Sequence, residues 1–267
     1  MLRPQPHRRF EPFNFLSGSH ALDYIRHTDD FPIGFIGGGP IGPTQARATI
    51  EESYQMKYGP IIHLALAPHD GSLGFGHDKV VVLNGLPDKH TTIVADAVVV
   101  PKIFGPFAVE TLLGDCSCNI VANPDWIGFI HAGTPELFEG LLDNFEGEWR
   151  YMDQSHVFMG PCITGRNYAY DPEKVPEKYK SFLLEADGSD TIFDDGYTFG
   201  LAEAVYSELD KWGAASLDNC LVDPFTENLG GGGWASARYY QFLKNVRGAG
   251  DGLSPRDMAL FHFEPAA

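Results

Sequence analysis

Short apolar runs alternate with turn-forming residues through the first half of the chain. Between residues 60 and 131 these runs are rich in β-branched side chains, and Gly, Pro, Asn and Asp separate them, which is the pattern of successive strands. The expected strands are Ile61–Ala67, Lys79–Leu83, Ile93–Val100, Ala108–Leu113, Asn119–Val121 and Ile127–His131. No stretch between residues 77 and 131 has the spacing of an amphipathic helix, so strand is expected to follow strand.

Helical spacing of apolar residues occurs on both sides of this strand-rich part. Residues 44–58 are predicted to form a helix, with Thr44 as its N-cap and Gly59 as its stop. Further elements are expected as helices at 135–149, 172–184 and 201–212, and as strands at 33–36, 157–163, 219–222 and 259–263. No regular element is predicted for residues 1–30. Because there is no repeat and no interdomain linker, residues 1–267 are expected to form a single domain with an irregular N-terminal extension at 1–30.

The composition indicates a folded protein with an acidic surface. Hydrophobic residues make up 43% of the 267 residues and aromatic residues 13%, which is enough for a sizeable core. The formal net charge is -17, from 36 acidic and 19 basic residues. Such a surface repels nucleic acid and anionic membranes, so neither is an expected partner, and the charge is otherwise typical of solubility.

The cysteine content and the length of the apolar runs indicate a protein with reduced thiols and without a targeting segment. The four cysteines, Cys116, Cys118, Cys162 and Cys220, are too few for a disulfide scaffold at this size, so reduced thiols are expected. No apolar stretch follows the arginines near the N-terminus, and no run is long enough to span a bilayer. We therefore expect a cytoplasmic protein.

One glycine-rich segment suggests a nucleotide site. Residues 37–42 contain G-x-G-x-x-G after an expected strand and before an expected helix, as in dinucleotide-binding units. An NAD-dependent enzyme that uses the Gly37–Gly42 loop is therefore one hypothesis. The strand-after-strand pattern of residues 77–131 argues against it, because a doubly wound fold should keep alternating strand and helix.

A second set of residues carries metal-site chemistry. Cys116 and His131 each come at the end of an expected strand, and His77 comes directly before another. Two imidazoles and one thiolate form a three-ligand set of the kind found in catalytic zinc sites, which leaves a fourth position for water or substrate. Without metal, Cys116 is a candidate nucleophile activated by histidine, and a core cysteine beside a coincidental histidine is the remaining interpretation.

Short motifs occur in a characteristic order along the chain. Gly114-Asp115-Cys116 is followed fifteen residues after the cysteine by His131-Ala132-Gly133. This pair of motifs resembles the A-D-C … H-A-G-W core of the laccase-domain (YfiH-like) family. Further segments match in the family's order between residues 74 and 263: Gly76-His77-Asp78-Lys79-Val80, Ala95-Asp96-Ala97, Met159-Gly160-Pro161-Cys162-Ile163 with Tyr168, Asp218-Asn219-Cys220, Ser236-Ala237-Arg238 and Pro255-Arg256-Asp257-Met258-Ala259.

The resemblance implies both a fold and an activity. It implies an α+β fold with α/β/β/α layers, related to the catalytic domain of cytotoxic necrotizing factor toxins. It also implies a zinc or copper ion held by His77, Cys116 and His131. Activities ascribed to the family are phosphorolysis of adenosine and inosine, adenosine deamination and phenol oxidation, the last giving rise to the names laccase and polyphenol oxidase.

Departures from the family pattern affect its basic and aromatic positions. Where the family has H-A-G-W-R-G, this chain has Thr134 in place of the tryptophan and Pro135 in place of the arginine. Tyr54 and Tyr239 replace two further arginines of the family pattern. A phosphate co-substrate needs cationic partners, so the phosphate side is expected to be weakened while the metal ligands are retained.

These observations lead to one principal hypothesis and two alternatives. The principal one is a zinc-dependent enzyme acting on purine nucleosides by phosphorolysis, hydrolysis or deamination, as a monomer or small homo-oligomer. Arg238 and Thr134 are its candidate substrate-binding residues. Asp115 is a candidate either to orient a metal ligand or to serve a structural role at the strand end. The alternatives are a binding or regulatory protein of the same fold without catalysis, and the NAD-dependent enzyme.

Overall fold

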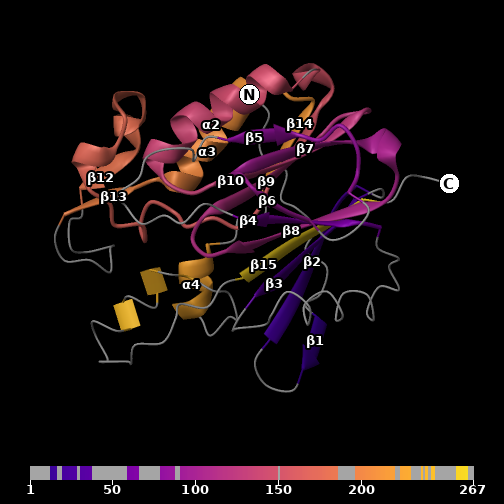
Figure 1. The fold of residues 1–267 in the computed structure, drawn as a ribbon. Coiled ribbons are helices and arrows are strands. Elements are labelled where there is room, and N and C mark those ends of the chain that lie inside the picture. Colours follow the sequence, from indigo (N-terminus) through magenta and orange to yellow (C-terminus); the bar gives the residue numbers. More distant parts are fainter. Residues whose placement is uncertain are drawn as a thin grey trace.

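The chain folds around two large β-sheets. The computed structural model describes residues 13–16, 20–28, 31–37, 59–65, 79–87, 91–149, 151–185, 196–219, 223–229, 236, 238–239, 242–243 and 257–263. Strands and helices together confirm the predicted α+β class (Figure 1).

The first sheet has seven strands in the order β1-β2-β3-β15-β8-β4-β6. The pairs from β1 to β8 are antiparallel, whereas β4 is parallel to both β8 and β6. The strands are β1 Phe13–Leu16, β2 His20–Thr28, β3 Phe31–Gly37, β4 Ile61–Ala65, β6 Thr91–Val94, β8 Phe107–Leu113 and β15 Asp257–Phe263.

The second sheet has six strands in the order β14-β11-β9-β10-β7-β5. Its centre is antiparallel, and its two edge pairs, β14 with β11 and β5 with β7, are parallel. The strands are β5 Val80–Val82, β7 Ala97–Pro101, β9 Ser117–Ala122, β10 Trp126–Ala132, β11 His156–Met159 and β14 Ser216–Asn219.

The two sheets enclose one hydrophobic core between them. Side chains from both sheets form a single buried cluster, for example Ile62 and Val109 from the seven-stranded sheet and Val98, Ile120 and Phe129 from the six-stranded sheet. Successive strand residues point to opposite faces, so Val99 and Val121, the neighbours of Val98 and Ile120, belong to a second cluster on the other face.

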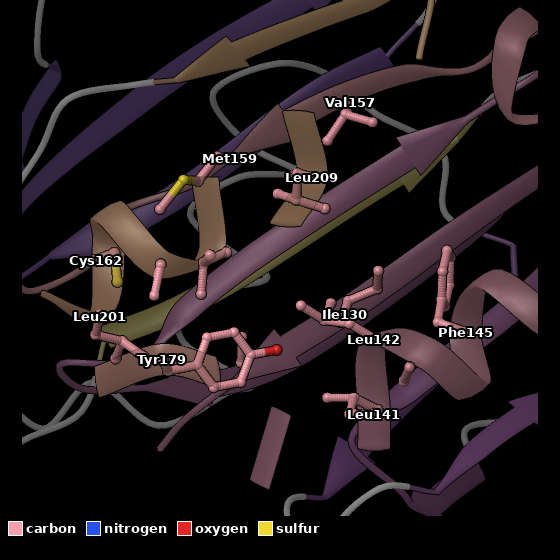
Figure 2. Close-up of a cluster of buried hydrophobic side chains, with 14 of the residues drawn as sticks. Ile130, Leu141, Leu142, Phe145, Val157, Met159, Cys162, Tyr179, Leu201 and Leu209 are labelled. Atoms are coloured by element: carbon pink, nitrogen blue, oxygen red, sulfur yellow. The ribbon is translucent and has the colours of Figure 1, made fainter. Parts of the chain in front are cut away.

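Two α-helices cover that other face of the six-stranded sheet. They are α2 Pro135–Glu148 and α3 Leu201–Lys211, both seen above this sheet in Figure 1. Figure 2 shows Leu141, Leu142 and Phe145 of α2 gathered near Ile130 of β10, with Leu209 of α3 in the same cluster. The apolar spacing that predicted these helices therefore matches the face that they bury.

A glycine allows α2 to approach the sheet closely. A Cβ atom at Gly128 of β10 would lie 2.4 Å from Cζ of Phe145. The Phe145 ring has no room to withdraw, because it stacks on Trp149 and Trp212 at centroid distances of 5.2 and 5.6 Å. The absence of a side chain at residue 128 is thus a packing requirement of this layer.

Shorter elements complete the described chain. They are the 3₁₀ helices η1 Lys102–Phe104, η2 Met152–Gln154, η3 Pro172–Lys174 and η4 Glu177–Phe182, the hairpin of β12 Leu183–Glu185 with β13 Tyr197–Phe199, and the helix α4 Pro224–Leu229. Within the described residues, no helix has the length and hydrophobicity needed to cross a membrane.

Three sequence-based expectations need correction. Residues 13–16 and 20–28, expected to be irregular, form β1 and β2, because β2 pairs with β3, whose other neighbour is the distant β15. The expected helix at 172–184 is instead two 3₁₀ helices followed by a strand. Pro172 is the first residue of η3 and Pro176 is the N-cap of η4, and a proline inside a continuous α-helix would break it. The single strand expected at Ile93–Val100 is two strands, β6 and β7, which belong to different sheets.

The topology also removes the basis for a dinucleotide-binding unit at Gly37–Gly42. Such a unit needs the strand before the glycine loop to lie in a parallel βαβ arrangement. β3, which ends at Gly37, has only antiparallel neighbours, β2 and β15. Residues 38–42 of the loop and the predicted helix at 44–58 lie outside the described residues.

Candidate metal and substrate site

Two chain crossovers between the sheets meet at the candidate site. The chain passes from β6 to β7 through Asp96, and from β8 to β9 through Cys116. β10 lies between β7 and β9 in the six-stranded sheet, and its residue His131 is paired with Cys118. The sheet order therefore brings Asp96, Cys116 and His131, which are distant in sequence, to one end of the six-stranded sheet.

His131 and Asp96 form a buried pair. The backbone N–H of His131 donates a hydrogen bond of 2.8 Å to the carbonyl of Asp96. The Nδ1 atom of His131 lies 3.8 Å from Oδ1 of Asp96, and the two side chains are only 1% and 2% exposed. A carboxylate facing Nδ1 favours the tautomer in which Nε2 is the nitrogen suited to a metal.

Cys116 lies against the same imidazole. Burial lowers the pKa of His131, but the negative charge of Cys116 and hydrogen bonds to Asp96 and Cys116 outweigh burial and raise this pKa to about 9. The predicted proximity of Cys116 and His131 is therefore present in the structure. Cys116 itself is half-buried, whereas His131 and Asp96 are almost completely buried.

The third predicted ligand, His77, lies outside the described residues. The described chain resumes at Lys79, whose carbonyl accepts hydrogen bonds from the N–H groups of Asp96, at 3.1 Å, and Ala97, at 3.2 Å. Within the part of the chain that is described, no three His, Cys, Asp or Glu side chains form a group that could hold a metal. A complete site therefore requires a ligand from elsewhere, and His77 is the predicted one.

Asp115 anchors a segment that is distant in sequence. Its Oδ1 accepts a hydrogen bond of 2.5 Å from the hydroxyl of Ser236, and its Oδ2 accepts one of 2.9 Å from the backbone N–H of Arg238. The carbonyl of Asp115 also accepts the N–H of Ile163 at 2.9 Å. Asp115 thus joins the Cys116 crossover to the Arg238 segment, which is a structural role; orientation of a metal ligand stays a prediction.

Arg238 lies beside the site on an aromatic ring. Its guanidinium carbon is 5.0 Å from the centroid of the Tyr168 ring, and the Tyr168 hydroxyl donates a hydrogen bond of 3.4 Å to the carbonyl of Gly133. Burial, and after it the negative charge of Cys116, raises the pKa of Tyr168 well above its usual range, so this hydroxyl stays protonated at neutral pH. Arg238 is thus linked to Gly133 through Tyr168, and Thr134, the other predicted substrate-binding residue, follows Gly133 in the sequence.

Thr134 begins the helix that follows His131. It is the N-cap of α2, yet its side chain makes no capping hydrogen bond, and it is half-buried. A hydroxyl at this position is suited to a polar substrate group at the end of the sheet.

The segment that carries Tyr168 is held by Asp223. Its Oδ2 accepts hydrogen bonds from the Thr164 hydroxyl at 2.5 Å and from the Asn167 amide at 2.7 Å. Its Oδ1 accepts the N–H of Phe225 at 2.8 Å, at the start of α4. Sequence reasoning gave no role to Asp223 or Asp96. An acidic residue within an apolar run, as in Ala95-Asp96-Ala97, was the available signal for Asp96.

Comparisons with known proteins reveal structural likeness without sequence likeness. Neither a protein-family model nor a curated protein matches the sequence. The hypothetical protein YfiH of Bacillus licheniformis is similar with a TM-score of 0.65 and 13% identity, over 91% of this chain and 96% of that one. YlmD of Geobacillus stearothermophilus is similar with a TM-score of 0.65 and 13% identity, over 95% and 99%.

A third solved structure agrees with these two. Neisseria meningitidis protein NMB0706, whose description assigns it to DUF152, is similar with a TM-score of 0.62 and 15% identity, over 89% of this chain and 96% of that one. The YfiH-like fold predicted from the motifs is therefore confirmed.

Proposed function

From this YfiH-like fold, we propose that the protein is a metal-dependent enzyme of the laccase-domain family that acts on purine nucleosides. Zinc is the proposed metal, with copper as the alternative, and His77, Cys116 and His131 are the proposed ligands. The observation that carries the proposal is the contact of Cys116 with a buried His131 whose Nδ1 faces Asp96.

The chemistry of these donors suits zinc. Zinc prefers cysteine sulfur and histidine nitrogen, and a metal-binding histidine usually directs its other ring nitrogen to a carboxylate or carbonyl. Asp96 supplies that carboxylate. His77 comes two residues before Lys79, whose carbonyl accepts a hydrogen bond from the backbone N–H of Asp96. Because two residues span no more than about 7 Å, this connection supports His77 as the third ligand.

A zinc ion in such a site supplies Lewis acidity toward a polar substrate group or water. The chain's own residues then have the task of binding and orienting the nucleoside. Arg238, held through Asp115 and stacked on Tyr168, presents a cation beside the site. Thr134 presents a hydroxyl at the start of α2.

The surroundings of Tyr239 support a lower affinity for a phosphate co-substrate than the family pattern implies. This residue replaces a family arginine, and its ring packs on Phe225 and Phe242 at centroid distances of 5.6 and 6.4 Å. Pro135, at another such position, is the first residue of α2. Each lost arginine removes a charge-assisted contact worth roughly 1.5–3 kcal/mol. Two independent losses lower phosphate affinity by about two to four orders of magnitude. We therefore propose that hydrolysis or deamination competes with phosphorolysis.

An assay of the zinc-loaded protein with adenosine and inosine, with and without phosphate, tests the proposal. The free base, inosine, ribose and ribose 1-phosphate would be separated and quantified. Turnover should change little on addition of phosphate and should disappear on chelation. A rate that saturates at low phosphate would identify a phosphorylase whose phosphate cation is Arg238 or another residue. Bound zinc without any turnover would favour the binding-protein alternative.

A further inference from the structure

Cys162 is a second thiol beside Cys116 that the proposed function does not use. It lies at the Met159 end of the hydrophobic cluster, where Figure 2 shows its sulfur among apolar side chains, and it is 3% exposed. Burial, and after it the negative charge of Cys116, raises the pKa of the Cys162 thiol well above its usual range. The two thiols are therefore close enough to interact electrostatically.

The strand register places the two residues opposite each other. β9 and β11 pair antiparallel with Asn119 opposite Met159. Two hydrogen bonds continue this register beyond the strands: Gly160 N–H donates to the Cys118 carbonyl at 2.7 Å, and Ile163 N–H donates to the Asp115 carbonyl at 2.9 Å.

Cys116 and Cys162 occupy one of the two opposed positions between these bonds, directly next to the bond from Ile163 to Asp115. Opposite residues on antiparallel segments have Cα atoms about 4.5–5.5 Å apart. Disulfides form at Cα separations of about 4.4–6.8 Å, so the backbone here suits a bridge without large movement.

We propose that Cys116 and Cys162 form a reversible disulfide when the protein meets a hydroperoxide. The disulfide would withdraw the Cys116 sulfur from metal binding. That consequence rests on the proposed function, whereas formation of the bond does not.

The two thiols have different roles because their exposure differs. Cys116 is half-buried and is reachable by a small oxidant, whereas Cys162 is enclosed. The Cys116 thiolate attacks one peroxide oxygen, so that an S–O bond forms, the O–O bond breaks, and hydroxide leaves and takes up a proton. The Cys162 sulfur then attacks the Cys116 sulfenic acid, so that S–S forms, S–O breaks, and water leaves with the Cys162 proton. In total two thiols lose two electrons and hydrogen peroxide becomes two waters.

Cys118 provides a matched control. It is only two residues from Cys116, but it is fully buried between the two sheets, in the cluster that contains Ile120 and Phe158. A Cys118→Ala variant therefore removes a thiol from β9, close in sequence to Cys116, without touching the proposed bridge.

The test is a peptide map of the full-length, metal-free protein after treatment with hydrogen peroxide and alkylation. We expect a mass loss of about 2 Da, a Cys116–Cys162 link, and full reversal by dithiothreitol. Cys118→Ala should behave like the wild type. In Cys162→Ala, Cys116 should be trapped as a sulfenic acid by dimedone, and longer exposure should give sulfinic acid that dithiothreitol does not reduce.

Two results would overturn the inference. One is a Cys116 link to Cys220 or to another chain. The other is oxidation of wild-type Cys116 to sulfinic acid as fast as in Cys162→Ala, without any link. A zinc-loaded sample in parallel should release zinc as the link forms and rebind it on reduction. If the link forms in protein that never binds zinc, the inference stands and the proposed function fails.

Discussion

The Nδ1 atom of His131 lies 3.8 Å from the Oδ1 atom of Asp96, and both side chains are almost completely buried. Neither residue is near the other in sequence, and the pair exists because β7 and β10 are neighbours in the six-stranded sheet. A buried carboxylate beside a histidine fixes the ring orientation and raises the basicity of the opposite nitrogen. Asp96 is therefore expected to determine how well His131 binds a metal.

Replacing Asp96 should weaken zinc binding without abolishing the fold. For Asp96→Asn we expect the zinc dissociation constant to rise about 10–100-fold, because the imidazole loses its charged partner. Competition against a chromophoric zinc chelator measures this constant. Asp210→Asn, an exposed change on α3, is the control and should leave the constant unaltered. Equal affinity in the two variants would show that Asp96 does not act through His131.

The raised pKa of His131 predicts a pH-dependent stability of the metal-free protein. The pKa rises from 6.5 to about 9 on folding, so the protonated form is favoured in the folded state. This contribution is fully present below pH 6.5 and is lost as the pH rises toward about 9. Denaturant unfolding of the metal-free protein should show that loss, and His131→Asn should not. Parallel pH profiles for the two proteins would contradict the assignment.

The contact of α2 with β10 predicts opposite effects of two glycine substitutions. Gly128→Ala should destabilise the protein by about 1–3 kcal/mol, because the new methyl group meets the stacked Phe145 ring. Gly147→Ala, on the exposed side of α2 with nothing near its Cβ, should stabilise it by up to about 1 kcal/mol. Urea unfolding measures both changes. A neutral Gly128→Ala would mean that α2 packs less closely than described.

The two hydrogen bonds to Asp115 predict a role in substrate binding and not in metal binding. Asp115→Asn should weaken the hold on Ser236 and on the Arg238 backbone, and should raise KM for nucleosides with zinc affinity little changed. Arg238→Ala should raise KM about 10–100-fold, and the exposed Arg166→Ala should not. Steady-state kinetics and zinc titration of these variants separate the two roles. Loss of zinc from Asp115→Asn would instead support orientation of a metal ligand.

The sequence predicted those features of the fold that depend on local pattern. The apolar spacing of α2 and α3 and the strand-end positions of Cys116 and His131 could be recognised directly. The division of residues 93–100 between two sheets could not, because Asp96 interrupts an otherwise continuous β-forming run and only sheet pairing makes it a crossover. The partnership of Asp96 with His131 was hidden for the same reason.

Long-range pairing accounts for the other features that sequence reasoning missed. β2, which was not expected, gains its place in the sheet through β3, and β3 in turn pairs with β15, where Met258 lies opposite Ile36. The opposition of Cys162 and Cys116 likewise follows from the register of β9 and β11, which no local pattern encodes. Such contacts depend on tertiary packing, which overrides local propensity.

Elemental analysis of the purified protein tests the central claim most directly. The wild type and Cys118→Ala, after zinc loading and removal of free metal, should each hold near one zinc per chain. Cys116→Ala should hold almost none, because removing one of three protein ligands weakens binding severely. Full zinc retention in Cys116→Ala, or no specific zinc in the wild type, would contradict the proposed site.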